Sequence, residues 1–288
     1  ALGRTGLPTA LISETGHDRV GRRVISLLEE NHVDASSVSV YPESKSPISL
    51  AFLNEHNDAE YIFYKDHPHD RLEMIYPDIH PDDIVMYGSF YAINPVIREQ
   101  MAAFLTFAHE RGAILYYDVN YRSSHRHELM KVKPNILENF ELATVVRGSK
   151  EDFEVMFDMQ DAEKVYRSEI SFYCKNFIYT QGPEPLEVRG VGGQSLQYPV
   201  EQTETVSTIG AGDNFNAGFV YGLVKYGITR EMLETGISKE QWDHLVSEAQ
   251  QFAANVCQSI NNSVDESFAE QKKLELETSL KEMENANE

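Results

Sequence analysis

The strongest constraint on the fold is an alternation of short β-rich segments with longer segments of helical periodicity along the 288-residue chain. Residues 9–13 predict a strand and residues 18–31 predict a helix. One apolar face runs along this helix and consists of Val20, Val24, Leu27 and Leu28. Further strands are predicted at residues 84–88, 113–118, 143–146 and 177–180. Strands that alternate with helices at this rhythm indicate an α/β fold with a doubly wound, mostly parallel sheet.

Capping residues predict where several helices begin and end. Asn94 followed by Pro95 is typical of an N-cap and a first helical position, and Gly112 is typical of a helix end. Ser149 and Asp152 have the spacing of a capping box, which predicts the start of another helix. Apolar periodicity predicts two further helices, over residues 213–224 and 247–260.

Two segments depart from this alternation, because each contains two β-rich runs with no helix between them. Residues 48–64 predict a β-hairpin around the polar turn 54–59, and residues 185–200 predict a second hairpin around 190–193. The second turn is similar to a dinucleotide-binding glycine loop. However, Tyr198-Pro199 ends the run where a helix would have to follow, so we interpret it as a hairpin turn.

The charge balance limits the partners of the chain. It has 25 basic and 46 acidic residues, which gives a formal net charge of −21. This charge argues against nucleic acid or an anionic membrane as the main partner, because both require basic patches. No run of 18 apolar residues is present, so no membrane-spanning helix is predicted. Cys174 and Cys257 have neither metal-binding nor disulfide-scaffold spacing, which favours a cytoplasmic location.

The most informative segment is Ser207–Phe219, which contains Gly210-Ala211-Gly212-Asp213. The glycines allow a tight turn that exposes backbone N–H groups at a helix N-terminus, and such a turn binds anions. A carboxylate there would repel a phosphate unless it had a function, and accepting a proton from an attacking hydroxyl suits Asp213. The alternative is an ordinary N-cap aspartate. The chain has no Gly-x-x-x-x-Gly-Lys-Ser/Thr sequence, which excludes a P-loop kinase, and no Gly-x-Ser-x-Gly sequence that would indicate a hydrolase.

This segment closely resembles the C-terminal signature of the ribokinase (PfkB) family of sugar kinases, Asp-Thr-x-Gly-Ala-Gly-Asp followed by a helix of small residues. Other segments that resemble family regions, in the expected order, are Gly16–Gly21, Asn31–Asp34, Asp118–Arg122 and Thr180–Gly182. The hairpin at residues 48–64 takes the place of the family's β-lid over the sugar. The resemblance covers about residues 1–264 and implies a ribokinase-like fold.

The resemblance predicts a kinase domain over residues 1–264 with a β-lid insertion over residues 45–66. The charged residues 265–288 predict a surface helix that frays into a disordered tail, and a partner-binding helix is the alternative. Family members begin with a strand and a Gly-Gly substrate loop, which we expect to be missing upstream of Ala1. The unpaired edges of the lid predict a homodimer in which the lids pair.

Three positions differ from the family pattern. Gly148 stands in place of the Asn of the family's Asn-x-x-Glu motif, Pro185 in place of the second glycine of the nucleotide loop, and Ser207 in place of the first Asp of the signature. In some members that Asp helps to hold a monovalent cation, so the resemblance gives no support for such a site here.

The resemblance also implies catalytic and nucleotide-binding roles. Asp213 is expected to be the general base, and the backbone N–H groups of Gly210–Gly212 are expected to form the anion hole. Glu151 is expected to orient the waters of a Mg²⁺ ion that bridges the nucleotide phosphates, and a first-turn helix Glu is the alternative. Asn255 is a further nucleotide candidate, for which a buried helix Asn is the alternative.

Residues after two strands are expected to contact the substrates. Asp118, Asn120 and Arg122 follow a strand at the edge where doubly wound sheets bind ligands, and they are expected to bind the sugar. The alternatives are a structural salt bridge for Arg122 and loop capping for the other two. Thr180 and Gly182 are expected beside the ribose and adenine of the nucleotide.

Together these expectations describe an ATP-dependent kinase that phosphorylates a primary hydroxyl of a small sugar or sugar acid. Asp118-x-Asn120-x-Arg122 resembles the motif of fructokinase-like and 2-keto-3-deoxygluconate-kinase-like members, which favours fructose or 2-keto-3-deoxygluconate. The alternatives are a nucleoside or sugar-phosphate kinase on the same fold, and a non-catalytic regulatory protein that binds nucleotide or sugar.

Overall fold

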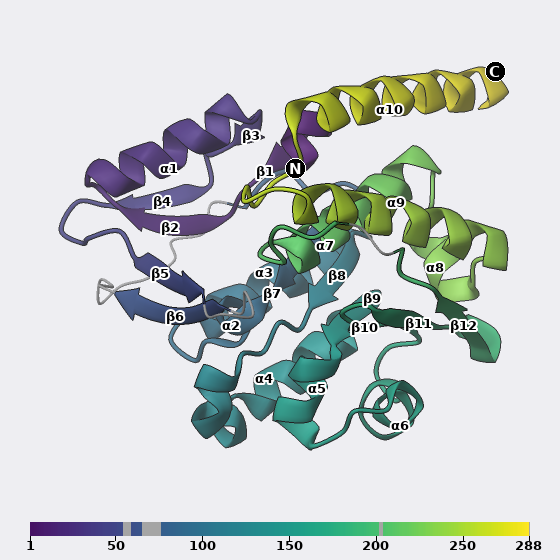
Figure 1. The fold of residues 1–288 in the computed structure, drawn as a ribbon, viewed down its shortest axis with the longest axis horizontal. Coiled ribbons are helices and arrows are strands. Elements are labelled where there is room, and N and C mark those ends of the chain that lie inside the picture. Colours follow the sequence, from purple (N-terminus) through teal and green to yellow (C-terminus); the bar gives the residue numbers. More distant parts are fainter. Residues whose placement is uncertain (54–58, 65–75, 202–203, 288) are drawn as a thin grey trace. The chain divides into compact units, whose positions relative to one another are not determined.

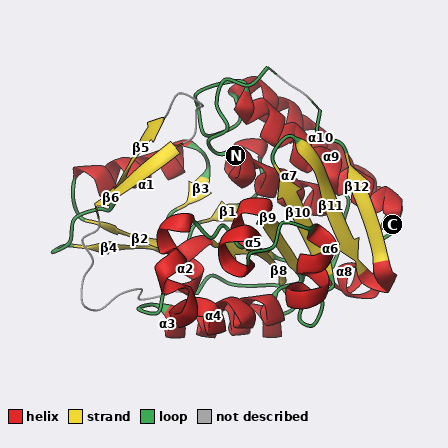
Figure 2. Cartoon of the chain, turned by 60° about the horizontal axis from the view of Figure 1, so that its bottom comes forward, coloured by secondary structure: helices red, strands yellow, loops and turns green. Residues whose placement is uncertain are grey.

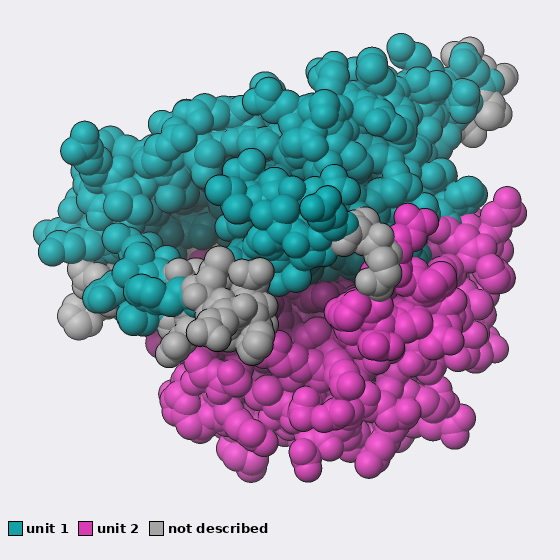
Figure 3. All heavy atoms as spheres, viewed as in Figure 1, with its two compact units in different colours: residues 1–77, 203–227, 244–288 teal, residues 78–202, 228–243 magenta. Residues whose placement is uncertain are grey.

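The computed structural model describes residues 1–53, 59–64, 76–201 and 204–287 (Figure 1). The chain folds into two compact units, which are coloured separately in Figure 3. Unit 1 comprises residues 1–77, 203–227 and 244–288, and unit 2 comprises residues 78–202 and 228–243. No helix in the described ranges is long and apolar enough to cross a membrane.

Unit 2 is built around a six-stranded sheet in the order β12-β11-β10-β9-β8-β7. Its strands are β7 (Ile84–Gly88), β8 (Ile114–Asp118), β9 (Val145–Ser149), β10 (Asn176–Gln181), β11 (Glu184–Gly190) and β12 (Gln194–Tyr198). Strands β7 to β10 are parallel neighbours, whereas β11 and β12 pair in antiparallel fashion. All five residues of β8 are buried, as is typical of a parallel strand. The sheet is therefore mostly parallel, as the sequence predicts.

The hairpin predicted at residues 185–200 is present, and it extends the main sheet. β11 pairs with β10 on one side and with β12 on the other. The connection, Val191–Gly193, is a single turn in which Gly192 and Gly193 have φ values of 76° and 79°. Residues with a side chain rarely adopt this backbone conformation, which explains why both positions are glycine. A strand follows the turn, so it is a hairpin turn and not a dinucleotide loop.

Helices flank the strands of unit 2 (Figure 2). They are α2 (Ser89–Ile93), α3 (Arg98–Glu110), α4 (Leu129–Leu142), α5 (Lys150–Phe157), α6 (Ala162–Val165) and α8 (Arg230–Thr235), with the short turns η2 (Ser123–Glu128) and η3 (Tyr166–Ile170). α3 and α4 contact each other and β8, and α5 contacts β9 and β10. The capping box of α5 is confirmed, because Ser149 Oγ accepts the Asp152 N–H and Asp152 Oδ2 accepts the Ser149 N–H.

The helix predicted to start at Asn94 begins later than its capping residues suggest. Asn94 ends α2, and its side-chain oxygen accepts the Val96 N–H at 3.0 Å. The Ile97 N–H then donates to the Asn94 carbonyl, which closes a turn. Asn94 therefore stabilises a turn between two helices, and α3 starts only at Arg98. Its predicted end at Gly112, which has a φ of 84°, is confirmed.

The described residues of unit 1 form three small two-stranded sheets. Parallel pairs join β1 (Thr9–Ala10) to β3 (Val33–Asp34) and β2 (Ser13–Gly16) to β4 (Val38–Tyr41), and the antiparallel pair is β5 (Ile48–Leu53) with β6 (Ala59–Tyr64). The single strand predicted at residues 9–13 is wrong in one respect. The chain changes partner after Leu11, whose N–H donates to Asp34, and therefore forms two strands.

The predicted helix at residues 18–31 and the predicted lid hairpin are both present. Asp18 caps α1 (Arg19–Glu30) by accepting the Gly21 N–H at 2.8 Å. Strands β5 and β6 form the lid hairpin, and its turn at residues 54–58 lies outside the described residues. Both elements expose large apolar side chains, namely Val20, Val24 and Leu27 of α1 and Ile48, Leu50, Phe52, Ile62 and Tyr64 of the hairpin.

The remaining helices of the chain are α7 (Ala211–Lys225), α9 (Lys239–Cys257) and α10 (Glu266–Asn287), preceded at the N-terminus by the turn η1 (Leu2–Thr5). α9 begins before the predicted residue 247, because Ser238 and Gln241 form reciprocal capping bonds. It ends before the predicted residue 260, because the N–H groups of Gln258 and Ser259 close a tight turn.

Helix α10 contributes to the core of unit 1, unlike a helix that lies wholly on the surface. Its Ala269 and Leu276 belong to one apolar cluster with Tyr221 of α7 and Phe252 of α9. α7 and α9 approach closely at Gly218, where an added Cβ would lie 2.5 Å from the Glu248 carbonyl oxygen. The small residues of α7 therefore serve helix packing.

A buried ion-pair cluster joins the three helices α7, α9 and α10. Glu248 of α9 accepts from Lys225 of α7 and from Lys272 of α10, both at 2.8 Å. Glu275 of α10 completes the cluster at 2.7 Å from Lys225 and 3.1 Å from Lys272. Glu248 and Lys272 are each only 2% exposed, so both depend on ion pairs within this cluster for compensation of their charge, and they are each other's most buried partner.

We expect Glu248→Gln to lower the free energy of unfolding by about 3 kcal/mol, because it removes the buried counter-charge of Lys272. Urea denaturation followed by circular dichroism measures the loss. Glu275→Gln is the matched control, since Glu275 contacts the same lysines with a side chain that is 31% exposed. Its expected loss is below about 1 kcal/mol. Equal losses for both variants would contradict this account.

Candidate active site

The carboxyl ends of parallel strands bring two predicted site residues of unit 2, Asp118 and Thr180, to the same edge of the sheet. Gly88 pairs with Asp118, Asp118 with Arg147, and Ser149 with Thr180 in the strand register. β7 and β8 approach closely here, because a Cβ on Gly88 would lie 1.9 Å from the Asp118 carbonyl oxygen. In doubly wound sheets this edge is the usual place of ligand binding.

Arg147 connects two of these residues, and sequence reasoning missed it. Its Nη1 donates to Asp118 Oδ1 at 2.9 Å, and its Nη2 donates to Thr180 Oγ1 at 2.7 Å. Arg147 is 7% exposed and Asp118 is 6% exposed. Burial acts to lower the pKa of Arg147, but the Asp118 carboxylate raises it above its ordinary value, so the guanidinium stays charged. The available signal was a charged residue directly after the strand predicted at residues 143–146.

The loop after β8 is fixed by Asp152, the buried capping residue of α5. Asp152 Oδ1 accepts the Tyr121 N–H at 2.7 Å, while its Oδ2 accepts the N–H and hydroxyl of Ser149. Burial raises the pKa of the Asp152 carboxyl, and the charge of Arg147 opposes this effect. Asn120, between these anchors, has a left-handed φ of 40°, which asparagine tolerates better than most residues. The loop geometry is therefore set by packing and not by Asn120 alone.

Arg122 and Glu151 both present their charges to solvent. Arg122 is exposed, and its guanidinium forms no ion pair with any residue in the described part of the chain. The salt-bridge alternative for Arg122 thus has no partner among those residues. Glu151 is exposed in the first turn of α5, directly after the capping box. An exposed carboxylate at this position is suited to accept hydrogen bonds from waters bound to a Mg²⁺ ion.

Gly182 forms the turn between β10 and β11, next to Thr180. Its φ is 64°, and an added Cβ would meet no atom within 4 Å. The glycine is therefore required by backbone conformation rather than by a crowded neighbour.

In unit 1, Gly210 forms the N-cap of α7 with a left-handed φ of 83°. The Ala211 N–H donates to the Thr208 carbonyl at 3.2 Å. The N–H groups of Gly210 and Gly212 donate to no residue within the described ranges. Asp213 is exposed in the first turn of α7. Two backbone donors and one carboxylate thus lie together at the start of a 15-residue helix.

Asn255, on α9, is bonded to the residue that caps α10. Its amide nitrogen donates to Asp265 Oδ2 at 2.6 Å, and its oxygen accepts the Asp265 N–H at 3.0 Å. The Phe268 N–H, the Ser267 hydroxyl and the Asn255 amide lower the pKa of Asp265 to about 2. The predicted contact of Asn255 with a nucleotide stays a prediction.

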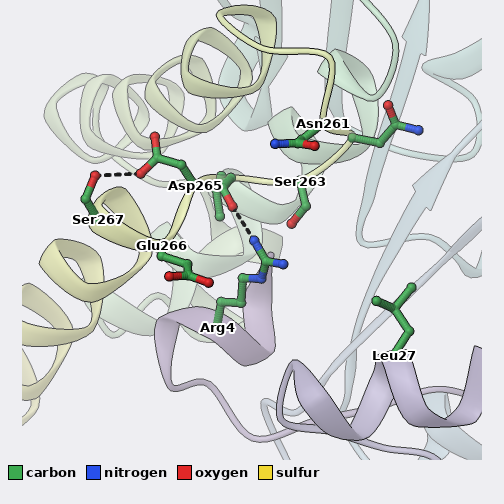
Figure 4. A pocket seen from close by; sticks show the side chains of 9 residues that line it. Arg4, Leu27, Asn261, Ser263, Asp265, Glu266 and Ser267 are labelled. Atoms are coloured by element: carbon green, nitrogen blue, oxygen red, sulfur yellow. Dashed lines mark hydrogen bonds between the residues drawn. The ribbon is translucent and has the colours of Figure 1, made fainter.

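A cleft of about 800 Å³ also opens in unit 1, beside the start of α10 (Figure 4). Arg4 donates to the Val264 carbonyl at 2.7 Å there, and the Ser267 hydroxyl donates to Asp265 at 2.7 Å. No residue with a predicted role lines this cleft. The cleft therefore adds no residue to the predicted site.

The chain matches the profile of the pfkB family carbohydrate kinases over residues 1–267. It belongs to the pfkB family. It is 27% identical over 237 residues to 5-dehydro-2-deoxygluconokinase of Geobacillus thermodenitrificans, covering 77% of this chain and 69% of that protein. It is 25% identical over 271 residues to probable fructokinase-6, chloroplastic, of Arabidopsis thaliana, covering 91% and 67%.

Solved structures show the same fold as this pfkB-family chain. Aminoimidazole riboside kinase from Salmonella enterica, complexed with aminoimidazole riboside and an ATP analogue, has a TM-score of 0.76 at 18% identity, covering 96% of this chain and 88% of that one. Fructokinase from Vibrio cholerae O395, bound to fructose, ADP and calcium ion, has a TM-score of 0.76 at 18% identity, covering 91% and 83%.

These comparisons confirm three predictions. The α/β fold is ribokinase-like, the family is that of the PfkB sugar kinases, and the protein is a carbohydrate kinase. The roles predicted for individual residues stay predictions. The structure groups them by unit, with Asp118, Asn120, Arg122, Glu151, Thr180 and Gly182 in unit 2 and Gly210–Asp213 and Asn255 in unit 1.

Proposed function

We propose that this pfkB-family kinase transfers the γ-phosphoryl group of ATP to a primary hydroxyl of a small sugar or sugar acid. The observation that carries the proposal is the start of α7, where the Gly210 and Gly212 N–H groups are uncommitted within the described ranges and Asp213 is exposed beside them. Backbone donors at a helix N-terminus stabilise a phosphate without a basic side chain.

In this proposal Asp213 is the general base. It accepts the proton of the sugar hydroxyl as that oxygen attacks the γ-phosphorus in line and the bond to ADP breaks. Gly210–Gly212 form the anion hole for charge on the transferred group. Since the Ala211 N–H donates to Thr208, we assign the main donors to Gly210 and Gly212.

The residues of unit 2 bind the two substrates in this proposal. Asp118, Asn120 and Arg122 contact the sugar, with Arg122 as a planar fork for hydroxyls or a carboxylate. Thr180 and Gly182 line the nucleotide site, with Asn255 of unit 1 as a further candidate. Glu151 would hold waters of a Mg²⁺ ion, which supplies neutralisation of the phosphate charge when it is bound. One structural neighbour, a double mutant of fructokinase from Vibrio cholerae O395, is bound to potassium ion. We leave a monovalent cation out of the proposal because Ser207 replaces the Asp that helps to hold such a cation in some members.

The substrate that we favour is a ketose or a keto sugar acid. Fructose and 2-keto-3-deoxygluconate agree with Asp118-x-Asn120-x-Arg122, and relatives named 5-dehydro-2-deoxygluconokinase add a second keto-deoxy sugar acid. The exposed guanidinium of Arg122 is suited to the carboxylate of such an acid. A riboside is the second candidate, because one structural neighbour is a riboside kinase.

We also propose that the kinase is a cytoplasmic homodimer. The exposed apolar side chains on one face of the lid hairpin support pairing with a second copy, since exposed ribbons of this kind are a liability for a monomer. Both cysteines are free thiols, which is usual in a reducing compartment.

We expect Asp213→Asn to reduce kcat at least about 100-fold while the KM for ATP stays within about threefold, because a general base acts in the transition state. A coupled assay of ADP release measures both constants. Glu231→Gln is the control, since Glu231 is the exposed first-turn acid of α8 and its loss removes only a helix-terminal charge. Near-normal turnover by Asp213→Asn would overturn the assignment of the base.

A sugar panel with ATP consumption as the readout tests the substrate. It contains D-fructose, 2-keto-3-deoxygluconate, 5-dehydro-2-deoxygluconate and aminoimidazole riboside. We expect Arg122→Lys to raise the KM for the preferred keto substrate about tenfold, because a point charge replaces the planar fork. Arg126→Lys is the matched control, because Arg126 is an exposed arginine of the turn η2, which directly follows Arg122. Nucleotide binding without turnover of any compound would favour a regulatory protein.

The lid proposal predicts a dimer by light scattering at micromolar concentration. We expect Leu50→Asp to give a monomer, because it places a charge on the exposed apolar face of β5. Ser49→Asp is the matched control, since neighbouring residues of a strand lie on opposite faces. A monomeric wild-type protein would refute pairing through the lid.

A further inference from the structure

Arg147 is a buried cation that the proposed mechanism does not use. It is the middle residue of β9, which lies between β8 with Asp118 and β10 with Thr180. Its two terminal nitrogens go to different strands, Nη1 to Asp118 at 2.9 Å and Nη2 to Thr180 at 2.7 Å. A guanidinium is planar and rigid, so both contacts together fix its orientation.

The backbone of the proposed sugar loop is anchored to the same strand and its helix. The Val119 N–H donates to the Arg147 carbonyl at 2.9 Å, and the Tyr121 N–H donates to Asp152 at 2.7 Å. The loop is therefore bonded to Arg147 twice, through the Arg147 carbonyl and through the Arg147 side chain. Displacement of one of these groups displaces the others, because a buried polar network tolerates no broken bond without cost.

Gly148 allows this arrangement to form. A Cβ at that position would lie 2.5 Å from the ring of Phe153 and 3.4 Å from the side chain of Val119. The absence of a side chain at Gly148 thus leaves room for the buried ring of Phe153 next to the loop residue Val119. The packing holds the end of β9, and with it Arg147, against the sugar loop.

We infer that Arg147 is a positioning residue that couples the sugar loop to the nucleotide end of β10, so that each substrate strengthens the binding of the other. The inference rests on the proposed function, in which Asp118 contacts the sugar and Thr180 contacts the nucleotide. A ligand that orders Thr180 orders Arg147, which holds Asp118 in its sugar-binding position. Coupling of this kind is reciprocal, so sugar must tighten nucleotide binding by the factor with which nucleotide tightens sugar binding.

Isothermal titration of adenylyl imidodiphosphate, with and without saturating sugar, measures the coupling in the full chain. The sugar is whichever keto compound of the panel the wild type phosphorylates fastest. We expect sugar to tighten nucleotide binding at least about fivefold in the wild type. In Arg147→Lys the ratio should fall close to one, because a lysine ammonium keeps the charge but loses the planar bridge between two strands.

Arg98→Lys is the matched control for loss of a buried guanidinium. Arg98 lies in the same unit, pairs with Glu138, and donates to Asn139 at 2.7 Å and to the Ala92 carbonyl at 2.7 Å. It contacts none of the proposed substrate residues. We expect Arg98→Lys to lower stability while it keeps the wild-type coupling ratio.

A second pair of variants tests the bridge without changing the arginine. Thr180→Val removes the acceptor of Nη2 but leaves the Arg147–Asp118 pair, and it should lose the coupling. Thr180→Ser keeps the hydroxyl and should restore it. This pair decides the question if Arg147→Lys fails to fold, as judged by circular dichroism.

The outcomes separate this inference from the proposed function. The inference is overturned if the wild type phosphorylates a sugar but shows no coupling. It is also overturned if folded Arg147→Lys or Thr180→Val keeps the full coupling ratio. Either result leaves the kinase assignment intact. Loss of the ratio in Arg98→Lys to the same extent would mean that Arg147 is only a structural ion pair. Failure of every compound in the panel overturns both proposals.

Discussion

The pairing of β7 to β10 in parallel is the constraint on which the rest of unit 2 depends. Parallel strands end at one edge, so residues 29 and 33 positions from Arg147 in the chain, Asp118 and Thr180, come within hydrogen-bond distance of it. Arg147 compensates the charge of the buried Asp118 carboxylate, and without this partner the buried charge would be strongly destabilising. The aligned strand ends therefore permit a buried ion pair between Asp118 and Arg147 beside the predicted sugar loop.

The formal charge of −21 imposes a different condition on unit 1. A chain this acidic repels anions in general, so an anion site needs donors arranged locally. At the start of α7 these donors are the backbone N–H groups of Gly210 and Gly212, and no basic side chain is needed. Lys225 and Lys272 are instead committed to Glu248 and Glu275 inside the helix cluster. The cationic side chains of this region thus stabilise the fold and leave anion binding to the turn.

Much of the fold could be predicted from sequence where the signal is local. The Ser149 capping box, the two hairpins and the start of α7 each depend on residues a few positions apart, and each is present. The start of α3 was misplaced because Asn94 caps a turn as readily as a helix, and only the packed structure decides between them.

Contacts between residues far apart in the sequence could not be predicted from such local signals. The family resemblance pointed to Asp118 and Thr180 as candidates but not to Arg147, because the bridge exists only once three strands are in register. Lys272 was likewise a charged residue in a charged helix, and its burial depends on Glu248, 24 positions away in another helix. Periodicity describes one element at a time, whereas these contacts belong to pairs of elements.

The three departures from the family pattern have local structural explanations. Gly148 makes room for Phe153, and the Ser207 hydroxyl accepts the Ile209 N–H at 3.2 Å inside the turn before α7. Pro185 lies where the register between β10 and β11 shifts, so its missing N–H breaks no regular ladder bond. Each residue is thus accommodated by the backbone around it. The three departures therefore do not disturb the fold on which the proposed kinase site depends.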